Sequence, residues 1–172
     1  MRASFVSTIE SLVTAIEAKS PSTKGHSEGV IKYAVAIAQG LGLPADQVEK
    51  IRVAAVLHDL GKIGIPDELL NRAGPLSDSE WVVMKRHPRM GFKIADPLDP
   101  KGEILFMIYH HHERYDGSGY PDGLAGEKIP LGACIIAAAD SYEAMTAVRP
   151  YQRSKTSAEA YGGAAAEGRH AI

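Results

Sequence analysis

The sequence predicts an all-α domain, because helical periodicity, helix-boundary residues and the lack of strand periodicity agree. Apolar residues recur three and four positions apart over long stretches, the spacing that places side chains on one face of a helix. Serine, glycine and proline stand where these stretches begin or end. No stretch alternates apolar and polar residues for long enough to predict a strand. We therefore expect a helical bundle with one long loop.

The N-terminal half of the chain contains three helical stripes of apolar residues. The first lies in residues 1–20 and forms a leading helix. The second runs from Val30 to Leu41 and ends at Gly42, a residue type that favours helix termination. The third runs from Val48 to Leu57 and leads directly into His58. An apolar helix that ends in polar groups needs a partner for them, because burying such groups unpaired is costly.

Boundary residues define the elements of the C-terminal half. The segment Ser77–Glu80, "SDSE", is a capping box that opens a helix, since serine and glutamate can each bind a free N–H of the first turn. Pro88 and Pro130 suit the first turn of two further helices. The glycine-rich segment from Asp116 to Lys128 predicts a long loop. The Ala/Gly-rich tail 157–172 lacks an apolar face, and we expect it to fray.

Length and composition limit the class of protein. A chain of 172 residues, 45% of them apolar, suits one domain, which we place at residues 1–156. A formal charge of −2 offers no general attraction to nucleic acid or to an anionic membrane. The single cysteine, Cys134, cannot form an internal disulfide, which favours the reducing cytoplasm. No apolar run is long enough to cross a membrane, and the N-terminus does not read as a signal peptide.

Histidines are the unusual feature of the composition. Imidazole suits iron, zinc, copper or nickel and carboxylate suits harder ions such as manganese, so a pocket that combines them fits a divalent transition metal. Each histidine alone also has a structural explanation, such as a helix cap or a solvated surface. Three adjacent imidazoles are the hardest to explain without a ligand. The seven histidines are His26, His58, His87, His110, His111, His112 and His170.

The order of the polar motifs resembles the HD-GYP family, a branch of the HD superfamily of metal-dependent phosphohydrolases. The motifs are "HS" at 26, "HDLGKIGIP" at 58, "HP" at 87, "HHERYDGSGYPDGL" at 111 and "AADSYEAMTAVRPY" at 138. The resemblance extends from about residue 21 to about residue 153, so that 21–156 forms the matched core. The GYP block is specific to this branch, whereas the short His-Asp pair indicates only the superfamily. The resemblance implies an HD-type helical bundle with a glycine-rich GYP loop.

The resemblance also implies a metal site and its ligands. Two divalent ions are expected, iron or manganese, with Asp59 as the ligand that bridges them. A glutamate that serves a third ion in some members is replaced here by Ser22, which favours two ions over three. His110 lies outside the family pattern and is either a supporting group or an accident. The implied metal ligands are His26, His58, Asp59, His87, His111, His112 and Asp140.

The remaining motif positions imply contacts with substrate. Lys62 matches the lysine of the "HDxGK" segment, and its place beyond the helix end can aim it at the metal pocket. Tyr120 and Arg149 match family positions that contact the nucleotide or its phosphates, and Arg153 adds a second basic group nearby. A loop-packing role for the tyrosine and a simple turn at "RPY" remain as alternatives. Lys62 and Asp59 are the residues expected to act in catalysis.

The resemblance implies a cyclic di-GMP phosphodiesterase, in which metal-bound hydroxide attacks a phosphate. The product would be the linear dinucleotide, with further cleavage to GMP left open. Two alternatives remain: an HD phosphohydrolase of another nucleotide, and a weakly active module that binds cyclic di-GMP or a signalling protein through the GYP loop. Neither a nucleic acid polymer nor membrane insertion is expected. The sequence leaves the oligomeric state open.

Overall fold

Helices form the regular structure of the part of the chain that the computed structural model describes, which is Ser11, residues 26–99 and residues 101–147. No strand occurs within these residues, where Asp116 and Ala125 form an isolated bridge. This confirms the all-α prediction. The α-helices are α2 (His26–Gly40), α3 (Ala45–Leu57), α4 (Asp67–Leu70), α5 (Asp78–Met84), α6 (His87–Ala95), α7 (Glu103–His110) and α8 (Leu131–Thr146). Short 3-10 turns are η2 (Leu60–Gly64), η3 (Asp96–Leu98) and η4 (Gly126–Lys128).

Several predictions fall outside the described residues. These are the leading helix in residues 1–20, the tail 157–172, and Ser22, Arg149 and Arg153. The domain limits 1–156 therefore stay a prediction. None of the described helices is both long and apolar enough to span a membrane.

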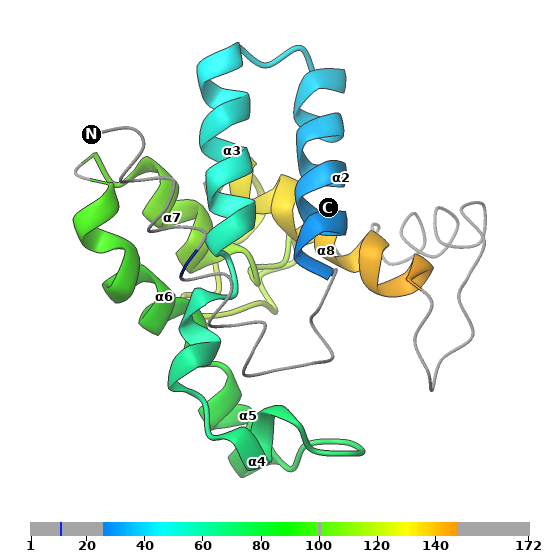
Figure 1. Cartoon of the computed structure of the whole chain (residues 1–172), viewed down its shortest axis with the longest axis vertical. Coiled ribbons are helices and arrows are strands. Elements are labelled where there is room, and N and C mark those ends of the chain that lie inside the picture. Colours follow the sequence, from blue (N-terminus) through cyan, green and yellow to red (C-terminus); the bar gives the residue numbers. More distant parts are fainter. Residues whose placement is uncertain (1–10, 12–25, 100, 148–172) are drawn as a thin grey trace.

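Helices α2 and α3 form an antiparallel pair (Figure 1). The turn between them contains Gly42 with a φ of 71°, a left-handed conformation that glycine adopts without a steric penalty. The N–H of Leu43 donates to the oxygen of Ala38 at 3.2 Å, which satisfies a free carbonyl of the helix end. Because the helix stops at Gly40, Leu41 lies in the turn with 58% of its surface exposed, and its expected place on the apolar face is wrong.

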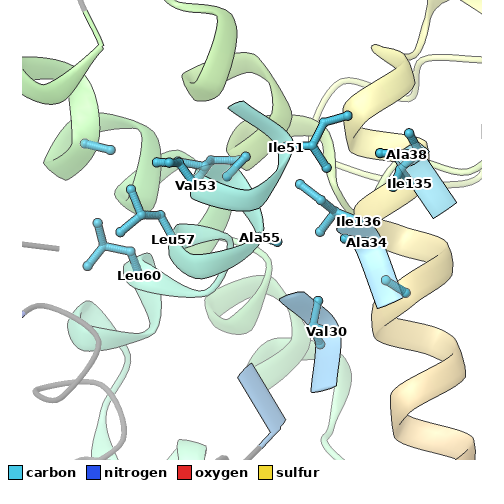
Figure 2. Close-up of a cluster of buried hydrophobic side chains, with 14 of the residues drawn as sticks. Val30, Ala34, Ala38, Ile51, Val53, Ala55, Leu57, Leu60, Ile135 and Ile136 are labelled. Atoms are coloured by element: carbon cyan, nitrogen blue, oxygen red, sulfur yellow. The ribbon is translucent and has the colours of Figure 1, made fainter. Parts of the chain in front are cut away.

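The core lies where α2, α3, α7 and α8 meet (Figure 2). Alanines on the facing sides of α2 and α8 let these helices approach closely, and isoleucine and leucine fill the space towards α3. The buried cluster includes Val30, Ala34, Ala38, Ile51, Ala55, Leu57, Leu60, Leu105, Ile108, Ile135, Ile136 and Ala139. The core thus holds together the start of α2 and the ends of α3 and α7, and these helix ends carry the predicted histidines.

Helices α4 and α5 lie away from the α2–α3 pair in Figure 1. The predicted capping box is present at the start of α5, where the N–H of Ser77 donates to the Glu80 carboxylate at 2.8 Å. The Arg72 guanidinium forms an ion pair with the same carboxylate. Hydrogen bonds at its start therefore define α5, since none of its residues is buried.

Gly61 sets the approach of α6 to η2. A Cβ atom at this position would lie 1.8 Å from the main-chain oxygen of His87 and 2.5 Å from the N atom of Gly91. Both contacts are with backbone, which cannot move aside as a flexible side chain can. Glycine at position 61 therefore lets η2, which carries Lys62, pack directly against the helix that begins at His87.

We predict that Gly61→Ala separates η2 from α6. The expected loss of unfolding free energy is at least the roughly 1–3 kcal/mol of an overpacked core. Because His87 moves with α6, metal bound per chain should fall as well. Denaturant unfolding and elemental analysis measure the two effects.

Gly40→Ala is the matched control, because a Cβ at Gly40 meets no atom within 4 Å and the residue is helical. This variant should match the parent or gain up to about 1 kcal/mol from helix propensity. Equal stability and equal metal content in Gly61→Ala and in the parent would contradict the packing argument.

Candidate metal centre

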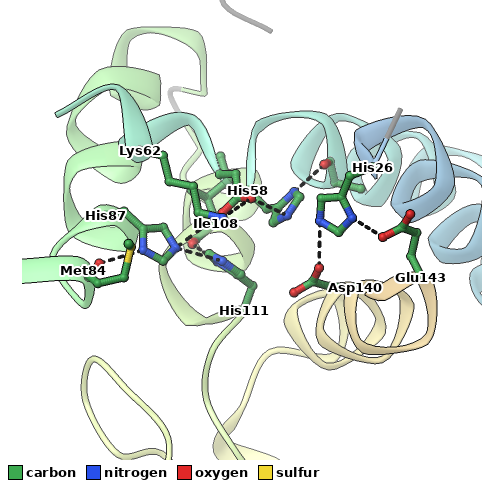
Figure 3. A network of polar contacts seen from close by, with 11 residues as sticks. His26, His58, Lys62, Met84, His87, Ile108, His111, Asp140 and Glu143 are labelled. Carbon is green, nitrogen blue, oxygen red and sulfur yellow. Dashed lines mark hydrogen bonds and ion pairs between the residues drawn. The ribbon is translucent and has the colours of Figure 1, made fainter. Parts of the chain in front are cut away.

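Three of the predicted ligands are held by the same arrangement. The Nδ1 atom of each ring lies at hydrogen-bond distance from a main-chain oxygen three residues earlier, in the last turn of α3, α5 or α7 (Figure 3). These oxygens lack an N–H partner within their own helix. Since a carbonyl only accepts, Nδ1 donates and Nε2 is left to face the pocket. The pairs are His58 with Ala55 at 2.8 Å, His87 with Met84 at 2.9 Å and His111 with Ile108 at 2.7 Å.

The structure brings all seven predicted ligands into two adjacent groups. In each group one ligand atom per residue lies within 4.8 Å of the others. The Nε2 atom of His58 in one group is 3.4 Å from the Oδ2 atom of Asp59 in the other, so the adjacent His-Asp pair connects them. One group is Asp59, His87, His111 and His112, and the other is His26, His58 and Asp140.

The donor set fits divalent cations. His58 Nε2 is buried and makes no hydrogen bond within the described structure, and such an atom is costly unless something binds it. The Nε2 atoms of His87 and His111 lie 3.4 Å apart, and His87 Nε2 is 3.6 Å from Asp59 Oδ1. Imidazole nitrogens and carboxylate oxygens that converge in this way can coordinate a transition metal.

Burial and neighbouring charges determine the protonation of these groups. Burial lowers the pKa of His87 and His111, and lowers that of His112 to about 3, so these rings are neutral ligands at pH 7. Burial also opposes ionisation of Asp59, but the charges of Lys62 and His58 hold the pKa of this carboxyl well below its usual range.

His58 differs from the other rings. Burial lowers its pKa, but the charge of Asp59 and its contact with the ring outweigh this effect and raise the pKa to about 9. A cation that binds at His58 would therefore displace a proton.

Lys62 lies beside the adjacent His-Asp pair, as predicted. Lys62 is three residues after Asp59, and its Nζ atom donates a hydrogen bond to Asp59 Oδ2 at 2.7 Å. The side chain is 21% exposed, and its ammonium group is held beside the predicted ligands by the Asp59 carboxylate.

Tyr120 lies beside the predicted ligand His112. Its ring stacks on His112 with centroids 4.7 Å apart, and its N–H donates to the main-chain oxygen of His112 at 3.1 Å. The ammonium group of Lys85 lies 5.3 Å from the centre of the tyrosine ring, a contact that the sequence did not suggest. These contacts account for the packing role of Tyr120, and its contact with substrate stays a prediction.

His110 belongs to neither ligand group and instead anchors the GYP loop. Its Nδ1 donates to the Phe106 oxygen at 2.9 Å, and its Nε2 lies 3.2 Å from Asp122 Oδ2. The buried carboxylate of Glu113 accepts the N–H groups of Asp122 and Leu124 at 2.8 and 3.0 Å. The end of α7 thus fixes the loop that carries Tyr120.

Sequence reasoning missed Glu113 and a second buried acid, Glu143. The Glu143 carboxylate contacts Nδ1 of His26, whose Nε2 is 3.0 Å from Asp140 Oδ1. The signal available for Glu143 was its position three residues after Asp140, which puts both on one face of α8. Glu113 gave no comparable signal, because the N–H groups that it binds lie in an irregular loop.

The fold and the site define a helical domain whose candidate metal centre is built around an adjacent His-Asp pair. The sequence model of the HD domain family matches residues 10–170. The chain therefore belongs to the HD domain family, and the resemblance to its HD-GYP branch is confirmed.

Curated relatives support this assignment. The cyclic di-GMP phosphodiesterase response regulator RpfG of Xanthomonas campestris pv. campestris is 44% identical over 87% of this chain and 40% of its own length. The 3'3'-cGAMP-specific phosphodiesterase 3 of Vibrio cholerae is 40% identical over 84% of this chain and 32% of its own length. The chain thus spans less than half of either relative.

A solved structure supports the fold. The HDG"Y"P protein Bd1817 of Bdellovibrio bacteriovorus superposes with a TM-score of 0.69 at 22% identity, over 89% of this chain and 48% of that chain. The expected HD-type helical bundle is therefore confirmed.

We predict that Glu113→Ala loosens the GYP loop and spares the metal centre. The variant leaves two loop N–H groups without their acceptor, and each unsatisfied group costs about 1–3 kcal/mol. Amide hydrogen exchange at Asp122 and Leu124 should become faster, while metal content stays at the parent value.

Glu127→Ala is the control, because it removes an exposed carboxylate from the same loop. This variant should leave amide exchange unchanged. Unaltered protection of both amides in Glu113→Ala would show that other contacts hold the loop.

Proposed function

We propose that the protein is a metal-dependent phosphodiesterase that hydrolyses cyclic di-GMP to the linear dinucleotide. The observation that carries this proposal is the pair of ligand groups joined at His58 and Asp59, with the Lys62 ammonium beside them. The relatives named as phosphodiesterases of cyclic dinucleotides support the substrate class. A product assay decides whether cleavage continues to GMP.

The proposed cofactors are two divalent ions, iron or manganese. Asp59, His87, His111 and His112 would hold one, and His26, His58 and Asp140 the other, with Asp59 also contributing to the second. Such ions supply neutralisation of phosphate charge and a lowered pKa for water at the site. The Nδ1 hydrogen bonds of His58, His87 and His111 keep those rings in the orientation that coordination requires.

Lys62 is the proposed electrostatic catalyst. Its ammonium group is fixed at the pocket by Asp59, where it can stabilise charge that builds up on a phosphoryl or leaving oxygen. Asp59 stays ionised and so can hold cations and the lysine together. Tyr120, Arg149 and Arg153 are the proposed substrate contacts, and the two arginines lie outside the described residues.

One assay separates this function from its alternatives. Purified protein with Mn²⁺ or Fe²⁺ is incubated with cyclic di-GMP, 3'3'-cGAMP or another nucleotide, and products are separated by chromatography. Linear product from cyclic di-GMP supports the proposal, and turnover of 3'3'-cGAMP alone would assign the specificity named for the Vibrio relative. Binding without turnover would indicate a binding module, in which the GYP loop could also contact a signalling protein. The proposed location is the cytoplasm, which rests on the single cysteine.

We predict that Asp59→Asn removes at least one ion and nearly all activity, with the helical fold retained. Asparagine keeps the size of the side chain but loses the charge that the cations share. Elemental analysis per chain and circular dichroism measure the outcome. Asp46→Asn, on the exposed side of α3, should change neither quantity. Full metal content with normal turnover in Asp59→Asn would remove Asp59 from the site.

Lys62→Met should leave metal content unchanged and slow turnover on the order of 100- to 1,000-fold, the effect of deleting one electrostatic donor. Methionine keeps much of the side-chain length without the charge. Lys93→Met removes an exposed lysine of α6 and serves as the control for loss of a positive charge. Turnover of Lys62→Met within a few-fold of the parent would contradict a catalytic role.

A further inference from the structure

Both nitrogens of the His26 ring face carboxylates of one helix. Nε2 lies 3.0 Å from Oδ1 of Asp140, and Nδ1 contacts the carboxylate of Glu143 (Figure 3). Glu143 lies three residues after Asp140 on α8 and is buried, with 8% of its surface exposed. His26 itself is 11% exposed at the side chain, so the contact is largely shielded from water.

His26 needs an acceptor from outside its own helix. The other rings with a described Nδ1 contact to backbone, such as His58 and His111, use a carbonyl in the last turn of a helix. His26 is instead the first residue of α2, and a helix N-terminus presents N–H groups rather than free carbonyls. The Glu143 carboxylate therefore takes the place that a main-chain oxygen occupies at the other rings.

Helix α2 leaves space for this carboxylate at Gly29. A Cβ atom there would lie 2.6 Å from Cγ of Glu143 and 3.5 Å from its Cδ and Oε1 atoms. Glycine inside a helix costs about 0.5–1 kcal/mol relative to alanine, so a close approach is a physical reason for glycine at this position. The absence of a side chain at Gly29 thus allows Glu143 to pack against α2 and contact His26.

We propose that Glu143 is a positioning residue for the part of the metal site formed by His26, His58 and Asp140. By accepting the Nδ1 proton of His26, it holds Nε2 towards the cation, as carboxylates do for many metal-binding histidines. Glu143 is not itself a member of either ligand group in the described structure. This inference rests on the proposed metal dependence.

The test is a Mn²⁺ titration of the full chain stripped by a chelator, with free Mn²⁺ followed by electron paramagnetic resonance. Glu143→Ala should weaken one of the two sites about 10- to 100-fold and leave the other unchanged. Glu143→Gln should retain most of the affinity, because the amide oxygen still accepts the Nδ1 proton. Gly29→Ala should reproduce the loss with Glu143 present, because the added methyl displaces the carboxylate.

Glu28→Ala is the control, since it removes an exposed carboxylate two residues from His26 with the same change in charge. Parent-like affinity in Glu143→Ala would overturn the inference, as would equal losses in the Gln and Ala variants, which would assign Glu143 a purely electrostatic effect. If Glu143→Ala does not fold, the Gly29→Ala and Glu143→Gln results decide. A parent protein that binds no Mn²⁺ and no Fe²⁺ would instead overturn the proposed metal dependence, and the inference with it.

Discussion

The hydrogen bond at Nδ1 is the interaction on which the candidate site depends, and it orients the rings of four predicted ligands, His26, His58, His87 and His111. An imidazole that binds a cation through Nε2 carries its proton on Nδ1, and an acceptor for this N–H fixes both the tautomer and the orientation of the ring. Helix C-termini supply acceptors without added residues, because their last carbonyls are free, and His58, His87 and His111 each use one. The same bond that satisfies a helix end therefore orients a predicted ligand.

This arrangement requires that several helix ends meet, and the packing of the core brings them together. Alanines on α2 and α8 allow those helices to approach, and glycines allow the closest contacts. Gly61 brings η2 against the backbone at His87, and Gly29 admits Glu143 beside His26. Both glycines lie within three residues of a predicted ligand, His58, Asp59 or His26. A larger side chain at either position would therefore displace the predicted ligands more than the hydrophobic core.

Helical periodicity and boundary residues predicted α2, α3, α5, α6 and α8, because both signals are local, but they gave no prediction for α4 or α7. The capping box at Ser77 and the helix that begins beside Pro88 are in place. The ligand set followed from motifs, and the structure brings those residues together. The contacts of His110 and Glu143 were not predictable in the same way, since they join residues 12 and 117 positions apart. Nor could periodicity show that α2 ends before Leu41, because the turn at Gly42 determines that boundary.

The charge distribution of the candidate site would allow a chain with a formal charge of −2 to attract the proposed anionic substrate. Five of the seven predicted ligands are imidazoles, and burial keeps His87, His111 and His112 neutral. With the two proposed divalent ions bound, the carboxylates of Asp59 and Asp140 offset only half of the metal charge. Lys62 adds one positive charge and Glu143 offsets it. The centre is left with about two excess positive charges, which would balance the two negative charges of a cyclic dinucleotide with two phosphodiesters. A site with mainly carboxylate ligands would bind the ions but lose this attraction, so histidine ligands would favour the proposed substrate as well as the proposed ions.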